Sequence, residues 1–269
     1  MRDITHLGRR LYVVAIAALG IQACLCAKVI FELEPVPAWV PGQTAIASLT
    51  GIALVAIATG LLLERIARIA AIALAALLVL WVLALHVPLL IPDPAPDLSF
   101  AFETVALAAM AWALAVGPAN AGATQSARAD AAASLWYARG AMSASLIAFC
   151  AVNFLYTRSI AAMIPGWIPA HRFWAYFTGI ASLAAAVSVI SGVQARLALV
   201  LLGVMYGSWV LIIHIPYLAA HPDDRDMWTD GFITLALAGG SWLLSGAIPC
   251  PARAAEPKDE EARARAGRC

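Results

Sequence analysis

The fold is decided by a stretch of sequence that occurs twice. Residues 36–91 read VPAWVPGQTAIASLTGIALVAIATGLLLERIARIAAIALAALLVLWVLALHVPLLI, and residues 164–219 read IPGWIPAHRFWAYFTGIASLAAAVSVISGVQARLALVLLGVMYGSWVLIIHIPYLA. The two stretches align without a gap at an offset of 128 residues, and 20 of their 56 aligned pairs are identical. The rarer identical pairs are Trp39/Trp167, Arg68/Arg196, Trp81/Trp209, His86/His214 and Pro88/Pro216. Chance matching of Ala- and Leu-rich segments does not produce such pairs. The sequence therefore predicts a duplicated unit whose function is carried out between two related halves.

The composition is that of an integral membrane protein. Of the 269 residues, 63% are hydrophobic and 12% are charged, and the mean hydropathy is +0.85. A soluble domain carries about 25% charged residues. The apolar residues form blocks of about 20, which is the length that a helix needs to cross the hydrocarbon core. The predicted spans cover about 11–30, 43–63, 66–91, 99–117, 138–157, 173–192, 195–219 and 230–248. We therefore predict an all-α membrane protein with eight transmembrane helices, four in each half.

The distribution of Lys and Arg predicts the orientation of these helices. If the N-terminus is cytoplasmic, thirteen of the 17 Lys and Arg residues fall in cytoplasmic segments and four in outer segments, as the positive-inside rule requires. Four spans per half is an even number, so the halves are predicted to be parallel repeats related by an axis along the membrane normal. We expect a multi-pass protein of a bacterial plasma membrane, surrounded by the lipid bilayer, with both termini cytoplasmic.

The domain boundaries follow from the same pattern. The first four-helix repeat is predicted at 1–117 and the second at 138–250. A cytoplasmic linker rich in Ala, Gly, Asn and Ser joins them at 118–137. Residues 251–269 combine Pro with charged side chains and have almost no large apolar residue, which predicts a disordered cytoplasmic tail.

Two matched segments place a tryptophan between two prolines. Residues 37–41 read PAWVP and residues 165–169 read PGWIP. Both prolines lack an N–H and restrict the preceding residue, so each segment is predicted to be a turn or a short extended piece. Trp favours the membrane–water interface. Trp39 and Trp167 are interpreted either as clips that start the following helix or as caps over a cofactor cavity.

The matched histidines are the main candidates for chemistry. His86 and His214 each stand two residues before a proline, which frees a carbonyl one turn earlier and tends to kink the helix. One interpretation is that each imidazole satisfies this local backbone. The other follows from the rule that ionisable groups inside a span are functional candidates. A parallel two-fold axis would bring both rings to one interior site, where they would ligate a metal or haem, relay protons or hold a quinone carbonyl.

Two acidic residues are predicted to accompany these histidines. Glu103 follows His86 by 17 residues and Asp230 follows His214 by 16, so each is expected near the histidine of its own half across a helix hairpin. A His–carboxylate pair accepts protons or orients the imidazole. The competing interpretation is that both acids only favour helix N-termini through the macrodipole. Trp81 and Trp209, which are also a matched pair, are further candidates for binding a cofactor.

Several other kinds of site are not predicted. Cys24 and Cys26 are two residues apart and point to different faces of a helix, so they do not form a metal pair, and no metal site is predicted. The chain has no P-loop, dinucleotide-binding fingerprint, Cys-x-x-Cys or Ser-His-Asp arrangement. The charges of the tail are mixed in sign, so nucleic acid is not an expected partner.

At these motifs the chain resembles the DoxX-like family of membrane proteins. The resemblance depends on residues 165–169, 174–179 and 196–198, and on His214-Ile215-Pro216 followed by Trp228. It covers both halves, and the second half matches better. The resemblance implies four-helix units, a membrane location and association with redox or maturation systems. The family takes its name from a subunit of a thiosulfate:quinone oxidoreductase, but the resemblance does not identify thiosulfate as the substrate.

Two functions are consistent with this sequence. In the first, the protein is a quinone-linked redox protein or a subunit of a membrane oxidoreductase. Its cavity lies between the spans 66–91 and 195–219, His86 and His214 contact a quinone or haem, and Glu103 and Asp230 manage protons. In the second, it is a non-enzymatic accessory subunit of another membrane or redox protein, or a small-molecule transporter. The proline-rich breaks lie at the interface and not at the midplane, which argues mildly against transport.

Overall fold

A computed structural model describes residues 2–91, 97–117 and 124–248, and over these residues the chain is helical without strands. The elements are α1 (Arg2–Cys26), α2 (Gln43–Leu62), α3 (Ala67–Trp81), η1 (Val82–His86), α4 (Val87–Leu90), α5 (Leu98–Val116), α6 (Gln125–Leu155), α7 (Thr157–Met163), α8 (His171–Ser191), α9 (Ala195–Trp209), η2 (Val210–His214), α10 (Ile215–Ala220) and α11 (Arg225–Ala247). The elements α3, η1 and α4 run on as one helix, and so do α9, η2 and α10. The predicted tail at 251–269 lies outside the described residues.

Seven of the described helices are long and apolar enough to cross a membrane. They cover 3–26, 43–62, 67–90, 98–116, 129–155, 171–191 and 195–220. This is the structure of a multi-pass membrane protein. The eighth predicted span corresponds to α11, which has 23 residues but is not one of the seven. Its first two turns carry Arg225, Asp226 and Asp230, and its interior is rich in Gly and Ser, which lowers its hydropathy.

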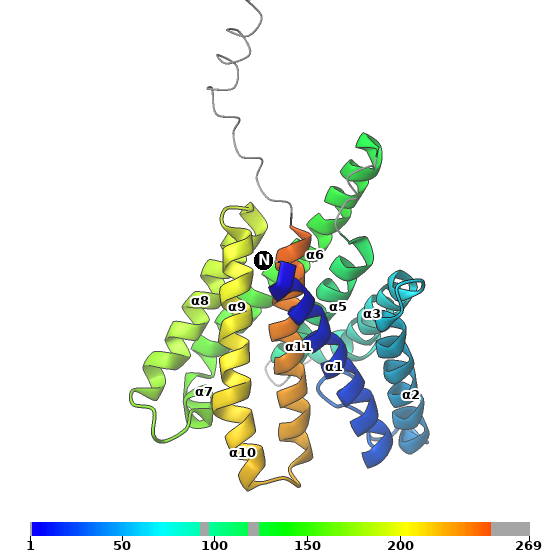
Figure 1. Cartoon of the computed structure of the whole chain (residues 1–269). Helices are drawn as coiled ribbons and strands as arrows, with labels where there is room; N and C mark the ends of the chain where they lie inside the picture. The colour runs from blue at the N-terminus through cyan, green and yellow to red at the C-terminus, as the bar shows by residue number, and fades with distance from the viewer. Residues whose placement is uncertain (1, 92–96, 118–123, 249–269) are drawn as a thin grey trace, which may run out of the picture.

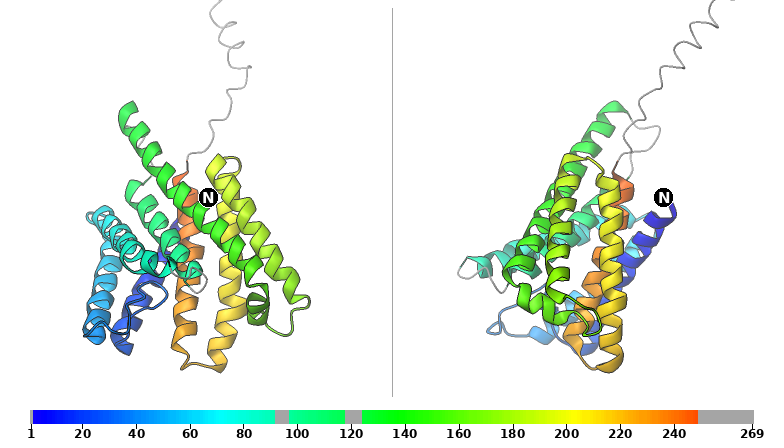
Figure 2. Two further views of the ribbon diagram at one scale, coloured as in Figure 1. Left: turned by 180° about the vertical axis from the view of Figure 1, so that it is seen from behind. Right: turned by 90° about the vertical axis from the view of Figure 1, so that its left-hand side faces the viewer.

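The helices form one bundle in which α5 and α11 lie at the centre (Figure 1; Figure 2). The first helix, α1, packs against α2 and α11, whereas α6 packs against α8 and α5. In the same way α3 packs against α5, and α9 packs against α11. The start of α1 and the end of α11 lie at the same end of the bundle (Figure 1). We call the opposite end, which carries the turns at Trp39 and Trp167, the tryptophan end.

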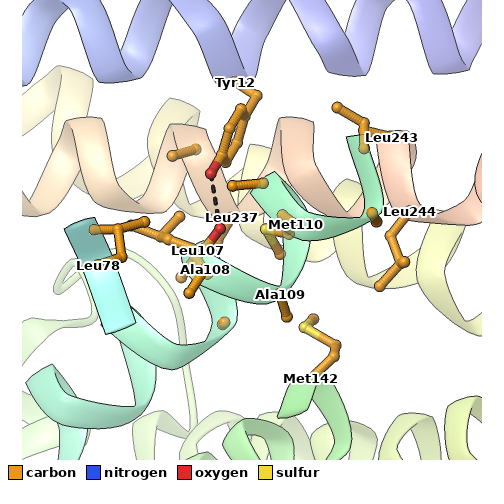
Figure 3. Close-up of a cluster of buried hydrophobic side chains, with 14 of the residues drawn as sticks. Tyr12, Leu78, Leu107, Ala108, Ala109, Met110, Met142, Leu237, Leu243 and Leu244 are labelled. Atoms are coloured by element: carbon orange, nitrogen blue, oxygen red, sulfur yellow. Dashed lines mark hydrogen bonds between the residues drawn. The ribbon is translucent and has the colours of Figure 1, made fainter. Parts of the chain in front are cut away.

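The core at the centre of the bundle is apolar and closely packed. Tyr12 of α1 is fully buried there, and its hydroxyl donates to the backbone carbonyl of Leu107 at 2.8 Å (Figure 3). Small residues allow the central helices to approach each other: a Cβ added at Gly239 of α11 would stand 2.6 Å from the carbonyl oxygen of Gly8 of α1. Such contacts between small residues are the usual way in which membrane helices pack.

The predicted kinks before Pro88 and Pro216 take the form of two π-helical turns. In η1 the backbone N–H of Val87 donates to the carbonyl of Val82, and in η2 the N–H of Ile215 donates to the carbonyl of Val210. Each bond reaches five residues back, because the proline ring prevents a regular turn. The widened turn ends at the histidine in both cases, and α3 and α9 begin and end 128 residues apart. Isolated π-turns are frequent at functional sites.

Part of the linker predicted at 118–137 is helical. Of this range, residues 118–123 lie outside the described part of the chain, and residues 125–137 form the first part of the 31-residue helix α6. This segment is rich in Ala, which has the highest helix propensity, and it continues without a helix breaker into the span that follows.

Candidate functional site

A cavity of about 1360 Å³ lies inside the bundle. It is lined by residues of α5, α6, α7, α8, α9, η2 and α11, so it belongs to the second half of the chain and the central helix α5. Its walls are mostly apolar. The cavity is partly open to the surface of the protein, and Phe177 of α8 and Leu201 of α9 in its lining are 48% and 57% exposed. The predicted location between the spans 66–91 and 195–219 is therefore wrong, because the lining includes α9 but no residue of α3.

The aligned positions of the two halves explain why the cavity forms in the second. Leu54 of α2 is 1% exposed and fills its site, whereas the aligned residue in α8 is Ser182, which lines the cavity. Ile57 packs against the core, and the aligned residue Ala185 is another lining residue. Ser182 and Ala185 are smaller than the residues aligned with them and are themselves 2% and 5% exposed, so they border the cavity with only a small part of their surface.

His214 stands at the wall of this cavity. Its ring is largely buried, with Nδ1 3.3 Å from the sulfur of Met227 and Nε2 3.2 Å from the hydroxyl of Thr234. Both partners come from α11, which therefore sets the orientation of the imidazole. A thioether is a weak acceptor, so the Nδ1 side of the ring is held loosely.

Both predicted acids reach the same cavity. Glu103 of α5 lines it and accepts a hydrogen bond of 2.9 Å from the hydroxyl of Ser99. Asp230 of α11 also lines it, and the charges of Glu103 and Asp230 interact with each other and with that of Glu32 in the loop after α1. Glu32 itself is 7% exposed. Two carboxyl groups, one from α5 and one from α11, thus line the same mostly apolar cavity as His214, and Glu32 lies near both of them outside the lining.

His86 lies in a separate buried cluster. Its Nδ1 is 2.7 Å from a carboxylate oxygen of Asp97, and its Nε2 is 3.1 Å from the carbonyl of Leu33 and 3.4 Å from the hydroxyl of Thr104. The hydroxyl of Thr104 already donates to the carbonyl of Phe100, so it faces the ring as an acceptor. Both nitrogens of this fully buried ring thus have oxygen partners inside the protein.

The predicted pairings are therefore corrected in two respects. The carboxyl partner of His86 is Asp97 and not Glu103, and Asp230 forms no hydrogen bond with His214 within the described residues. His86 and His214 share no hydrogen-bond partner within the described residues, and of the two only His214 lines the cavity.

The matched tryptophans also divide between the halves. Trp167 and Trp209 line the cavity, whereas Trp39 and Trp81 do not. The tight turns predicted at Trp39 and Trp167 are present, since Val40 donates to the carbonyl of Pro37 and Ile168 to that of Pro165, both at 3.0 Å. Trp167 is 72% exposed at the cavity and Trp39 is 82% exposed. Of the two interpretations, the cap therefore has a geometric basis only at Trp167.

Sequence reasoning missed two polar groups of these sites. Asp97 gives no functional signal in the sequence, because it follows a Pro- and Asp-rich stretch that is typical of a loop. Tyr206 of α9 is 2% exposed and lines the cavity, and its hydroxyl has no hydrogen-bond partner within the described part of the chain. The alignment of the two halves does distinguish Tyr206, because it places this tyrosine opposite the buried Leu78.

The described residues contain no group of three or more His, Cys, Asp or Glu side chains arranged to hold a metal ion. Comparison with known proteins adds no assignment: no family model matches the chain, and no curated protein or solved structure is significantly similar to it.

Proposed function

We propose that the protein binds a membrane-soluble quinone in the cavity of its second half and serves as a quinone-linked redox protein or as a subunit of a membrane oxidoreductase. The observation that carries this proposal is the combination of a large, mostly apolar and partly open cavity with His214, Glu103 and Asp230 at its wall. A mostly apolar pocket with a few convergent polar groups is the usual form of a small-molecule site.

The chemistry of a quinone suits this wall. Reduction of a quinone to a quinol takes up two electrons and two protons. In this proposal a partner redox protein supplies the electrons, and the carboxyl groups of Glu103 and Asp230 hold and transfer the protons. The imidazole of His214, with Thr234 beside it, offers a hydrogen bond to a ring oxygen. A haem between the two histidines is disfavoured, because both nitrogens of His86 are already bonded.

The proposal includes the arrangement of two parallel four-helix repeats, with α11 as the eighth span. Matched element bounds support it, as do matched packing partners: α1 against α2 and α6 against α8, α3 against α5 and α9 against α11. The excess of Lys and Arg at the end opposite the tryptophan end supports cytoplasmic termini in a bacterial plasma membrane. Membership of the DoxX-like family, which the sequence motifs resemble, is part of the same proposal.

The test is to purify the protein with its native lipids, extract it with organic solvent and quantify quinone per protein, alongside His214→Ala and the matched variant His86→Ala. We expect close to one quinone per protein in the wild type and a loss of at least tenfold in His214→Ala. A reduced-minus-oxidised optical spectrum of the same samples tests for haem. If the wild type holds neither quinone nor haem and binds no added quinone, the redox proposal is wrong.

In that case the accessory and transport functions can be separated by two measurements. Substrate flux in proteoliposomes tests transport, and loss of a partner protein in a deletion strain tests the accessory role. No contact in the described structure favours either function over quinone binding.

A further inference from the structure

The hydroxyl of Tyr206 is a polar group that the proposed function has not yet used. Tyr206 stands on α9, is 2% exposed, and lines the cavity, yet its hydroxyl has no hydrogen-bond partner within the described residues. The ring is held in place by an edge contact with Trp209 at 5.2 Å between centroids. Buried hydroxyls are normally bonded, and leaving one unbonded costs stability. The hydroxyl oxygen itself is covered by neighbouring side chains, so an acceptor reaches it only when a bound ligand displaces them. An unbonded buried hydroxyl on a residue that lines a cavity points to a ligand that supplies this acceptor.

A second buried tyrosine shows that the bundle can satisfy such a group. Tyr12 is 0% exposed, and its hydroxyl donates to the carbonyl of Leu107 at 2.8 Å. At the position aligned with Tyr206 the first half has Leu78, which is fully buried and has no polar atom in its side chain. Of these two aligned positions, only the one in the half with the cavity carries a hydroxyl. The leucine in the other half shows that helix packing does not require a hydroxyl at this position.

The position of Tyr206 relative to His214 limits the ligand. The two residues are eight positions apart on one continuous helical segment, which is about 12 Å along the helix axis. Both side chains line the cavity. Because of their separation along the helix, they cannot bond the same atom of a small head group. They instead suit two acceptor atoms at opposite ends of it.

We infer that Tyr206 donates its hydroxyl hydrogen to one oxygen of the bound ring, and that His214 with Thr234 bonds the oxygen at the opposite end. This inference rests on the proposed function and narrows it: the cavity selects a flat ring with oxygen atoms at both ends, as in a 1,4-quinone, over a lipid with a single polar head. Tyr206 is then a binding and specificity-determining residue.

The test compares Tyr206→Phe with the wild type, using 2-methyl-1,4-naphthoquinone and 2-methylnaphthalene, which lacks both oxygens. Equilibrium dialysis in detergent measures the two affinities. We expect Tyr206→Phe to lower the affinity for the quinone by about tenfold and to leave that for the hydrocarbon unchanged. Thr234→Val should lower the quinone affinity as well, and the two losses should multiply because they act on separate oxygens.

A matched control is Tyr12→Phe, which removes a hydroxyl that is already bonded. We expect it to lower the thermal midpoint by about 2–4 °C and to leave quinone affinity unchanged, whereas Tyr206→Phe should not lower the midpoint of the ligand-free protein. If the wild type binds the quinone and Tyr206→Phe binds it equally well, the inference is overturned and the proposed function stands. If the wild type binds the hydrocarbon as tightly as the quinone, or binds neither, the inference and the quinone proposal both fail.

Discussion

Filling the cavity with the residues that the first half uses should stabilise the protein and prevent quinone binding. The variant Ser182→Leu/Ala185→Ile transfers Leu54 and Ile57 to their aligned positions and adds about six carbon atoms at two residues that line the cavity and are themselves 2% and 5% exposed. At about 0.8 kcal/mol per buried carbon group the gain is at most about 5 kcal/mol.

Two costs reduce this gain. The variant loses the hydrogen bond of 2.9 Å from the hydroxyl of Ser182 to the carbonyl of Thr178, which is worth about 1 kcal/mol. Imperfect fit of the new side chains costs about 1–3 kcal/mol. The expected net effect is a stabilisation of about 2 kcal/mol, which corresponds to a rise of about 4–8 °C in the thermal midpoint.

The assay is thermal unfolding of the detergent-purified protein with and without added quinone, together with the quinone content after purification. The wild type should be stabilised by quinone, and the filled variant should be more stable without quinone and indifferent to it. The matched control, Leu54→Ser, removes a residue that already fills its site, and should cost about 2–5 kcal/mol without changing quinone binding. A filled variant that unfolds several degrees below the wild type, or that binds quinone normally, would refute the reasoning.

Three further predictions concern stability. Ala170 has a left-handed backbone with φ of 58°, so Ala170→Gly should raise the free energy of unfolding by about 1 kcal/mol in chemical denaturation, and an unchanged value would show that this turn is unstrained. Burial raises the pKa of the Glu34 carboxyl from 4.5 to about 7, so the native state holds the proton more tightly than the unfolded state. This group should therefore lower stability by about 2 kcal/mol as the pH rises from about 4.5 to 7, and Glu34→Gln should make the slope shallower by that amount in a pH series of melting curves. His86→Ala leaves the buried carboxyl of Asp97 without its partner and should cost about 3–5 kcal/mol, against about 1–2 kcal/mol for His214→Ala; equal losses would contradict the assignment of His86 to a structural cluster.

The sequence was informative wherever a local rule applied. Blocks of about 20 apolar residues predicted the seven helices that are long and apolar enough to span a membrane, because the hydrocarbon thickness fixes helix length. The prolines at 88 and 216 predicted a disturbance of the helix one turn earlier, which takes the form of η1 and η2. The turns at Trp39 and Trp167 followed from their flanking prolines.

The site was less predictable because it depends on differences between the halves. Symmetry suggested that His86 and His214 share a site, but a leucine at position 54 and a serine at position 182 give the halves different interiors. The pairing of His86 with Asp97 depends on where the start of α5 lies relative to η1, and no local sequence pattern specifies this position. The gathering of Glu103 and Asp230 at one cavity is a contact between α5 and α11, which are far apart in sequence.

The most direct test of the central claim is photolabelling with an azido-quinone followed by mapping of the labelled peptides by mass spectrometry. Saturable labelling of peptides that line the cavity, strongest in residues 174–214 and lost in Ser182→Leu/Ala185→Ile, is the result that a quinone site in the second half predicts. Equal labelling of the aligned residues 46–86, or labelling that excess unlabelled quinone does not suppress, would contradict it.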